Sequence, residues 1–261
     1  MDAAIWNKLS LLEETRTPHV LVVLTEVRGS APQDVGAKML VTREGAVLGT
    51  VGGGKVEAAA MRHAAGLLGI NESTRVETVE WNLQRDIGMT CGGAVVFLFH
   101  ARNFSSWSIA IFGAGHVVQA LAPLLVPLEA RVLIFDTRAE WIARLPKRPG
   151  FEAHCCPDPA AEVDALPAGS FLLAITQGHA TDVPILACAF RRGVFPFIGC
   201  IGSEVKAARL RRDLEALGIP GGTVRALRCP LGLPIGTNAP HEIAISIAAQ
   251  LLEVRDAVAG R

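Results

Sequence analysis

The feature that most constrains the fold is a regular alternation of strand-like and helix-like segments after Trp107. Strand-like apolar runs lie at residues 108–112, 131–135, 170–175 and 194–198, with a weaker one at 151–156. The helix-like segments between and after them cover residues 114–125, 138–145, 182–191 and 204–217. Strands that alternate with helices pair in parallel, because each helix carries the chain back across the sheet. The pattern therefore predicts an α/β domain with a doubly wound parallel sheet, covered by helices on both faces.

A Gly-Ala-Gly turn joins the first of these strands to its helix. Gly113 permits a tight turn, and Gly115 leaves room for a phosphate at the helix N-terminus, beside His116. Asp136 ends the next strand, where dinucleotide-binding domains carry the acid that reaches a ribose hydroxyl. Val118 stands at the third glycine position of that fingerprint. The turn predicts a Rossmann-like domain. It leaves open whether the domain holds NAD(P), another phosphate-bearing ligand or no dinucleotide.

The residues ahead of this domain follow a different pattern, which predicts a small α+β domain. Helical patterns cover residues 2–16 and 52–69, and strand-like segments cover 19–29, 38–51, 73–81 and 93–100. The polar sequence ARNFSS then separates the two patterns. We therefore expect an N-terminal domain at 1–103 and a Rossmann-like domain at 104–228. The C-terminal segment at 229–261 carries a long helix that the sequence assigns to neither domain.

Two glycine-rich turns in the N-terminal domain are candidate ligand contacts. One precedes a helix, where successive backbone N–H groups can face an anion, although a flexible hinge explains it equally well. The other contains a thiol with little bulk beside it, which suits a thiophilic metal but also suits a small buried side chain. The first turn is Gly52, Gly53 and Gly54, and the second is Cys91, Gly92 and Gly93, with Cys91 the candidate metal contact.

Polar residues and glycines also follow two of the later strands. His179 and Asp182 follow the strand expected to end near residue 175, and Gly199, Gly202 and Ser203 follow the one expected to end near 198. The carboxyl ends of parallel strands form the ligand-binding edge of an open α/β sheet. We therefore expect these five residues at a ligand site. The alternative for His179 is a helix entry at which Asp182 helps to cap the helix.

The composition limits the classes of partner and the cellular location that we expect. The chain has 25 basic and 25 acidic residues in 261, so charge gives no reason to expect nucleic acid or an anionic membrane as partner. No apolar run is long enough to span a membrane, and no basic leader precedes an apolar core, so we expect a cytoplasmic protein. The six cysteines show neither Cys-x-x-Cys nor the paired spacing of a zinc site, which fits thiols in a reducing compartment.

Taken together and in this order, the motifs resemble those of the XdhC/CoxI family, the accessory proteins of molybdenum hydroxylases such as xanthine dehydrogenase. The resemblance runs through nearly the whole chain. It rests on GSAPQDVGAKMLV, GTVGGGKVE, GMTCGGAVVFLF, IFGAGHVVQAL, ITQGHATD, FIGCIGSEVKAARL and CPLGLPIGTNAPHEIAISIAAQLL. Each glycine motif alone is a weak signal, and the series is a specific one.

The resemblance implies a chaperone, rather than an enzyme, that binds molybdenum cofactor (molybdopterin). Such a protein protects the cofactor, supports the replacement of a terminal oxygen by sulfur, and inserts the cofactor into the apo-hydroxylase. The implied partners are the molybdenum-binding subunit of xanthine dehydrogenase and a cysteine desulfurase, with a homodimer left open. Two alternatives stay open: an NAD(P)-dependent oxidoreductase and a nucleotide-sensing regulatory protein. The chain contains no tyrosine, so an oxidoreductase with this sequence would lack one common proton donor.

Overall fold

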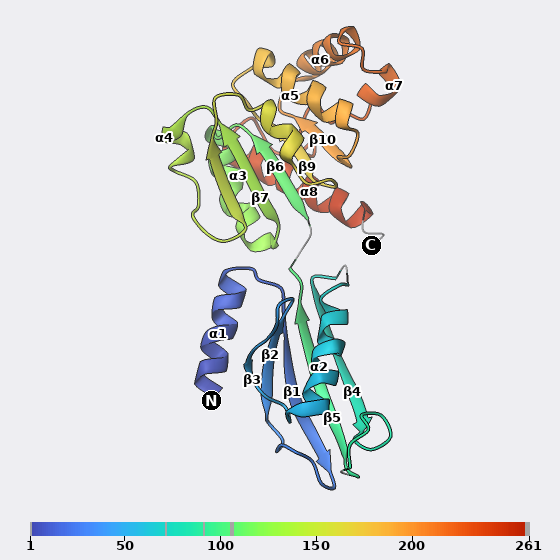
Figure 1. The fold of residues 1–261 in the computed structure, drawn as a ribbon. Helices are drawn as coiled ribbons and strands as arrows, with labels where there is room; N and C mark the ends of the chain where they lie inside the picture. Colours follow the sequence, from blue (N-terminus) through green and yellow to red (C-terminus); the bar gives the residue numbers. More distant parts are fainter. Residues whose placement is uncertain (1, 71, 91, 105–106, 259–261) are drawn as a thin grey trace. The chain divides into compact units, whose positions relative to one another are not determined.

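The computed structural model describes residues 2–70, 72–90, 92–104 and 107–258. The chain divides into two compact units, Met1–Ser106 and Trp107–Arg261 (Figure 1). The second unit includes the long C-terminal helix, whose domain the sequence had not decided. Among the described residues, no helix has the length and apolar character needed to cross a membrane.

The first unit is an antiparallel sheet with one helix on each face. The strand order is β3-β2-β1-β5-β4. The elements are α1 (Asp2–Glu14), β1 (His19–Arg28), β2 (Lys38–Thr42), β3 (Gly45–Gly49), α2 (Gly54–Leu67), β4 (Thr74–Asn82) and β5 (Ala94–Arg102). Successive residues of β1 point to opposite faces. Val20 and Val22 pack in the cluster that includes α2, whereas Leu21 packs with Ile5 and Leu12 of α1.

The second unit is a parallel five-stranded sheet with the order β10-β9-β6-β7-β8. Its strands are β6 (Ser108–Phe112), β7 (Arg131–Asp136), β8 (Phe151–Cys155), β9 (Phe171–Ala174) and β10 (Phe197–Cys200). The chain builds outward from β6 in one direction and then returns to add β9 on its other side. This order confirms the predicted Rossmann-like fold. It also creates a switch point between β6 and β9, where such sheets bind ligands.

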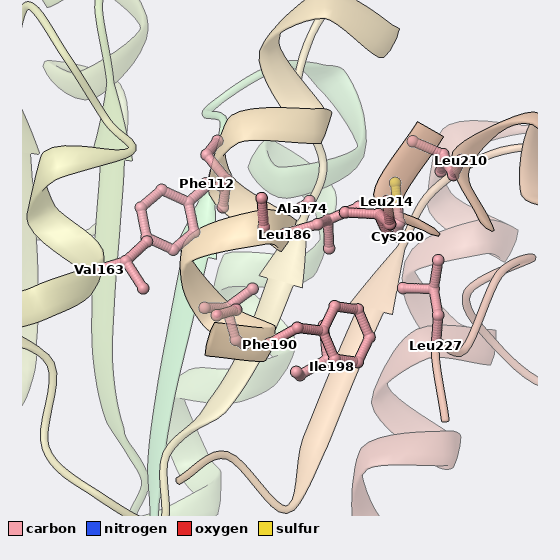
Figure 2. Close-up of a cluster of buried hydrophobic side chains, with 14 of the residues drawn as sticks. Phe112, Val163, Ala174, Leu186, Phe190, Ile198, Cys200, Leu210, Leu214 and Leu227 are labelled. Atoms are coloured by element: carbon pink, nitrogen blue, oxygen red, sulfur yellow. The ribbon is translucent and has the colours of Figure 1, made fainter. Parts of the chain in front are cut away.

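Helices cover both faces of the parallel sheet (Figure 1). α3 (His116–Leu125) and α8 (Pro240–Val258) share one apolar cluster, and α5 (His179–Arg192) and α6 (Glu204–Ala216) share the other. Figure 2 shows the second cluster, in which Leu186 and Phe190 of α5 meet Phe112 and Ile198 of the sheet. The remaining elements are short: η1 (Val126–Leu128), α4 (Ala139–Ile142), η2 (Ala161–Ala165) and α7 (Gly221–Val224).

Several element boundaries differ from the sequence-based expectation, and two elements begin three residues away from their expected start. α5 begins at His179 rather than 182, because the backbone N–H groups of Thr181 and Asp182 already donate to Gly178 O, both at 3.1 Å. The last strand is Phe197–Cys200 rather than 194–198. It begins after Pro196, which has no N–H to give to a strand ladder. Gly199 therefore lies inside a strand rather than beyond its end.

The turn after β6 is packed against the end of β9. Gly113 N–H donates to Phe135 O, and Ile175 N–H donates to Phe112 O, both at 2.7 Å. Gly113 has a φ of +113°, and a Cβ placed on it would lie 2.0 Å from Ile175 O. Gly115, two residues on, has a φ of −69°, and a Cβ there would meet no atom within 4 Å. The first glycine is required by packing, whereas the second leaves space open.

These two glycines respond differently to the same substitution. Gly113→Ala should lower the free energy of unfolding by at least about 2 kcal/mol, because a backbone carbonyl blocks the new methyl group and φ is left-handed. Gly115→Ala should cost less than about 1 kcal/mol, the usual loss for alanine at a helix N-cap. Urea denaturation of both variants measures the difference. Equal losses would contradict the packing assigned to Gly113.

Candidate functional site

A pocket lies at the carboxyl edge of the parallel sheet, at the switch point between β6 and β9. Its lining includes Gly113, Asp136, Arg138, Thr176, Gln177 and Thr181, which come from the ends of β6, β7 and β9 and from the start of α5. Of these, the sequence had singled out Gly113 and Asp136. The other four were missed, and three of them, Thr176, Gln177 and Thr181, are turn or helix-start residues that carry little signal in one sequence.

The Asp136 carboxylate occupies the centre of this edge, and its side chain is 5% exposed. Oδ2 accepts a hydrogen bond from the backbone N–H of Ala114 at 2.6 Å and from Arg138 Nη2 at 2.7 Å. Oδ1 accepts from the backbone N–H and from Nε of Arg138, both at 2.9 Å. Four donors from the chain itself thus surround the carboxylate that the sequence had assigned to a ribose.

These contacts fix the ionisation state of Asp136. Burial alone would raise its pKa, but hydrogen bonds from the Arg138 side chain and from the backbone N–H groups of Arg138 and Ala114 outweigh burial and lower the pKa. The hydrogen bond between Arg138 and Asp136 also raises the pKa of Arg138. The pocket therefore contains a carboxylate and a guanidinium that are both charged at neutral pH.

Arg138 is the cation that lines the pocket. Asp136 holds one edge of its guanidinium, and the Trp141 ring lies 5.0 Å from the guanidinium carbon. With its amide oxygen toward Arg138, Gln177 accepts from Nη1 at 2.8 Å. A guanidinium fixed on several sides is suited to phosphate recognition. The signal in the sequence was an arginine just past the second strand, the place where such domains accommodate an extra phosphate.

The open side of the glycine turn lies next to this arginine-bearing segment. Gly115 is the N-cap of α3, and nothing in the protein fills the space over its Cα. His116 is exposed and meets the Trp141 ring edge-on, with 4.8 Å between the ring centroids. Val118, at the third glycine position, is fully buried in the core between α3 and the sheet. The helix end is thus accessible to a phosphate, while the position expected to bring helix and strand close is filled by a valine.

Asp182 lies behind the pocket rather than in it, and its side chain is fully buried. Oδ1 accepts from Thr176 Oγ1 at 2.7 Å, and Oδ2 pairs with Lys206 Nζ at 2.6 Å. Burial would lower the pKa of Lys206, but the bond to Asp182 outweighs it and raises the pKa. Lys206 also donates to Ile201 O at 2.8 Å. This buried ion pair ties α5 and α6 to the ends of β9 and β10.

The other residues predicted at this edge have contacts of their own. His179 Nε2 lies 2.6 Å from Asp213 Oδ2 on α6, and Ser203 caps α6 by accepting from Lys206 N–H at 3.3 Å. A Cβ on Gly202 would lie 2.5 Å from the Lys206 side chain, and one on Gly199 would lie 2.4 Å from Leu231. Close packing thus accounts for both glycines. None of these residues lines the pocket.

In the first unit, the Gly52–Gly54 turn is closed by a side chain of its own helix. Glu57 accepts from the backbone N–H of Gly53 at 3.3 Å and from the hydroxyl of Thr50. All three glycines have positive φ, at +143°, +64° and +51°. The Glu57 carboxylate therefore accepts from a backbone N–H that the sequence had predicted to face an external anion.

In the other glycine-rich turn of this unit, packing explains one of the two glycines. A Cβ on Gly93 would lie 2.3 Å from Ser30 O, whereas one on Gly92 would meet nothing within 4 Å. Cys91 lies outside the described residues, so its predicted metal contact stays a prediction. Among the described residues, no group of three or more His, Cys, Asp or Glu side chains is arranged to hold a metal ion.

The sequence matches two family models that together run through both units. Residues 109–251 match the XdhC Rossmann domain, and residues 12–80 match the XdhC and CoxI family. The chain belongs to the XdhC and CoxI family. The resemblance inferred from the motifs is therefore confirmed.

Two relatives from Escherichia coli K12 align along most of this XdhC/CoxI chain. The molybdenum cofactor insertion chaperone PaoD is 25% identical over 90% of this chain and 83% of its own length. The uncharacterized protein YqeB is 26% identical over 98% of this chain, which spans only 47% of YqeB. A crystal structure described as a xanthine dehydrogenase from Bacillus halodurans has a TM-score of 0.52 at 20% identity, covering 96% of this chain and 95% of its own. That likeness shows the fold alone.

The Asp136 contacts make a testable contribution to the stability of this XdhC/CoxI protein. Asp136→Asn should lower the free energy of unfolding at neutral pH by about 1–3 kcal/mol, because Arg138 and the Ala114 N–H lose a charged partner. The folded-state pKa is lowered, so this stabilisation is present above the unfolded carboxyl pKa, near 4, and is lost as the pH falls through the folded-state value.

Urea denaturation between pH 7 and pH 3 measures this contribution, with the exposed Asp164→Asn as control. The gap between wild type and Asp136→Asn should narrow as the pH falls, while the control shows little difference throughout. A gap that stays constant over this range would show that the carboxylate charge contributes nothing.

Proposed function

We propose that this protein is an accessory protein that binds molybdenum cofactor as cargo and delivers it to a molybdenum hydroxylase. The observation that carries the proposal is the alignment with PaoD, a molybdenum cofactor insertion chaperone, over 90% of this chain. Membership of the XdhC and CoxI family supports the same function. The expectation of an accessory protein rather than an enzyme agrees with both.

The pocket in the second unit suits the phosphate-bearing part of such a cargo. The Gly115 turn leaves the N-terminus of α3 uncovered, and helix N-termini stabilise phosphate groups. Arg138 adds a guanidinium that Asp136 and Trp141 hold in place. In this proposal Gly115 admits the phosphate and Arg138 pairs with it. Both contacts serve a pterin phosphate or its dinucleotide form equally.

The oxidoreductase alternative, which rested on Gly113, Gly115 and Asp136, loses one of these three observations. Asp136 was the candidate acceptor for a ribose hydroxyl of NAD(P), but Ala114 and Arg138 already donate to both of its oxygens. Burial of Val118 gives the third fingerprint position a packing function. The Asp136 carboxylate thus serves as the counter-ion of Arg138 rather than as a ribose ligand. Nothing in this arrangement requires hydride transfer.

The finer parts of the function are proposals of the same kind. They include support for cofactor sulfuration with a cysteine desulfurase, delivery to the molybdenum-binding subunit of a xanthine dehydrogenase, and a cytoplasmic location. Cys91 and Gly92 are proposed as further cargo contacts, whereas the Gly52–Gly54 turn is not, because Glu57 already accepts from the Gly53 N–H. His116, exposed beside Trp141, is proposed as a contact near the phosphate.

Replacement of Gly115 tests the placement of the phosphate. Gly115→Val puts a branched side chain into the open space at the helix end and should weaken cofactor retention at least about ten-fold, while the fold is kept. The measurement is pterin and molybdenum bound per protein after anaerobic loading and gel filtration. Gly222→Val is the matched control, because that glycine on α7 is exposed and a Cβ placed on it would also meet no atom within 4 Å.

Cofactor retention by a folded Gly115→Val variant at the wild-type level would place the phosphate elsewhere. Robust hydride transfer between NAD(P) and an alcohol or hydroxy acid by the wild-type protein would reject the chaperone function itself. The two outcomes are distinguishable. The first would reject only the phosphate contact at Gly115, and the second would reject the chaperone function.

A further inference from the structure

Cys200 and Cys229 lie on adjacent, hydrogen-bonded chain segments of the second unit. Arg228 N–H donates to Ile198 O and Cys200 N–H donates to Arg228 O, both at 2.9 Å, so Gly199 and Arg228 face each other in a parallel bridge. The next residue on each segment is a cysteine. Residues in register on neighbouring strands project to the same face, and both side chains belong to one apolar cluster. Backbone pairing therefore sets the two thiols side by side.

Both thiols are free and buried. Cys200, at the end of β10, is fully buried in the cluster that also contains Leu214 of α6 (Figure 2), whereas Cys229 is 5% exposed. Cys200 Sγ donates within its own segment, to Ile201 O at 3.5 Å. Cys229 lies between α7 and α8, in a stretch without regular secondary structure apart from its bridge to β10. Of the two thiols, Cys229 is the one that lies outside a regular strand.

The charges around the pair distinguish the two sulfurs. The neighbouring Cys200 thiol lowers the pKa of Cys229, and the cations of Lys206 and Arg211 add to this effect against burial. The pKa of Cys200 is raised, first by the neighbouring Cys229 sulfur and then by burial. Asp182 is the acid that faces the pair, and it is already matched by Lys206. Of the two sulfurs, Cys229 is thus the one that loses its proton more readily.

We propose that Cys200 and Cys229 are a reversible modification site, a dithiol that closes to an intramolecular disulfide on reaction with a hydroperoxide. The proposal goes beyond the cargo-binding function and does not depend on it. Reactive dithiols need a second thiol within reach of the first, and the bridge between β10 and the Arg228 segment supplies this.

The reaction balances with the hydroperoxide as oxidant. The Cys229 thiolate attacks the O–O bond, forming an S–O bond and releasing an alkoxide, or hydroxide from hydrogen peroxide, which takes up a proton. Cys200, on losing its proton, then attacks the Cys229 sulfur, forms the S–S bond and expels hydroxide, which leaves as water. Two thiols lose two electrons in total, and one hydroperoxide is reduced to an alcohol and water.

The same polar groups connect the dithiol to the pocket. Lys206 lies near Cys229, whose pKa it lowers, and pairs with Asp182, and Asp182 accepts a hydrogen bond from Thr176, which lines the pocket. Closure of the disulfide removes the ionisable thiol beside Lys206. The modification site is therefore one buried ion pair away from the candidate cargo site.

Peptide mapping of the full chain tests the proposal. The protein is treated with hydrogen peroxide, blocked with N-ethylmaleimide and digested with trypsin. The sequence places Cys200 in the peptide Gly193–Lys206 and Cys229 in the peptide Cys229–Arg255. We expect these two peptides to appear linked, with the mass of two hydrogens lost, and to separate on reduction with dithiothreitol. Two maleimide-blocked peptides, or linkage of either one to the exposed Cys155, would overturn the proposal.

Single variants test the order of the steps. In Cys200→Ser, dimedone should trap a sulfenic acid at Cys229, at least about ten-fold faster than it labels Cys200 in Cys229→Ser. Cys188→Ser is the matched control, because it removes a half-buried thiol from α5 and should leave the linked peptides unchanged. Faster labelling of Cys200 would overturn the assignment of Cys229 as nucleophile. Thermal melts of each reduced variant confirm that labelling is measured on folded protein.

Discussion

The site in the second unit depends on the Asp136 carboxylate. It lies at the end of β7, accepts from the backbone N–H of Ala114 in the glycine turn, and holds Arg138 by two side-chain bonds. A buried carboxylate is stable only when hydrogen bonds and a counter-charge compensate it. Here the compensation fixes both the glycine turn, at which we propose that a phosphate binds, and the cation proposed to pair with it. One interaction therefore sets the shape and the charge of the pocket.

The sequence predicted the fold well because the signals were local and repeated. Alternating strands and helices predicted the parallel sheet, and Gly113 marked the tight turn that the close approach of Ile175 requires. Boundaries failed where a single residue decided them. The last strand begins only after Pro196, which lacks an N–H. α5 begins at His179, because Gly178 O accepts the first hydrogen bonds of the helix.

The site was predicted only in part, because much of it depends on contacts between residues far apart in the chain. Asp136 was placed correctly at the sheet edge, but its contacts with Arg138 could not be read from spacing. The burial of Asp182 against Lys206 and the pairing of Cys200 with Cys229 also join distant segments. Conversely, Gly93 and Gly199 looked like ligand contacts because glycine marks close approach of any kind. In these two cases the approaching atoms belong to the protein.

The account is tested most directly by the small molecule that copurifies with the protein from its native host under anaerobic conditions. If the Asp136–Arg138 pocket and the open turn at Gly115 serve a molybdenum cofactor chaperone, the isolated protein should contain pterin and molybdenum in equal amounts. Their content should fall together in the Gly115→Val variant. A nicotinamide dinucleotide in place of the pterin, retained through gel filtration, would contradict the account.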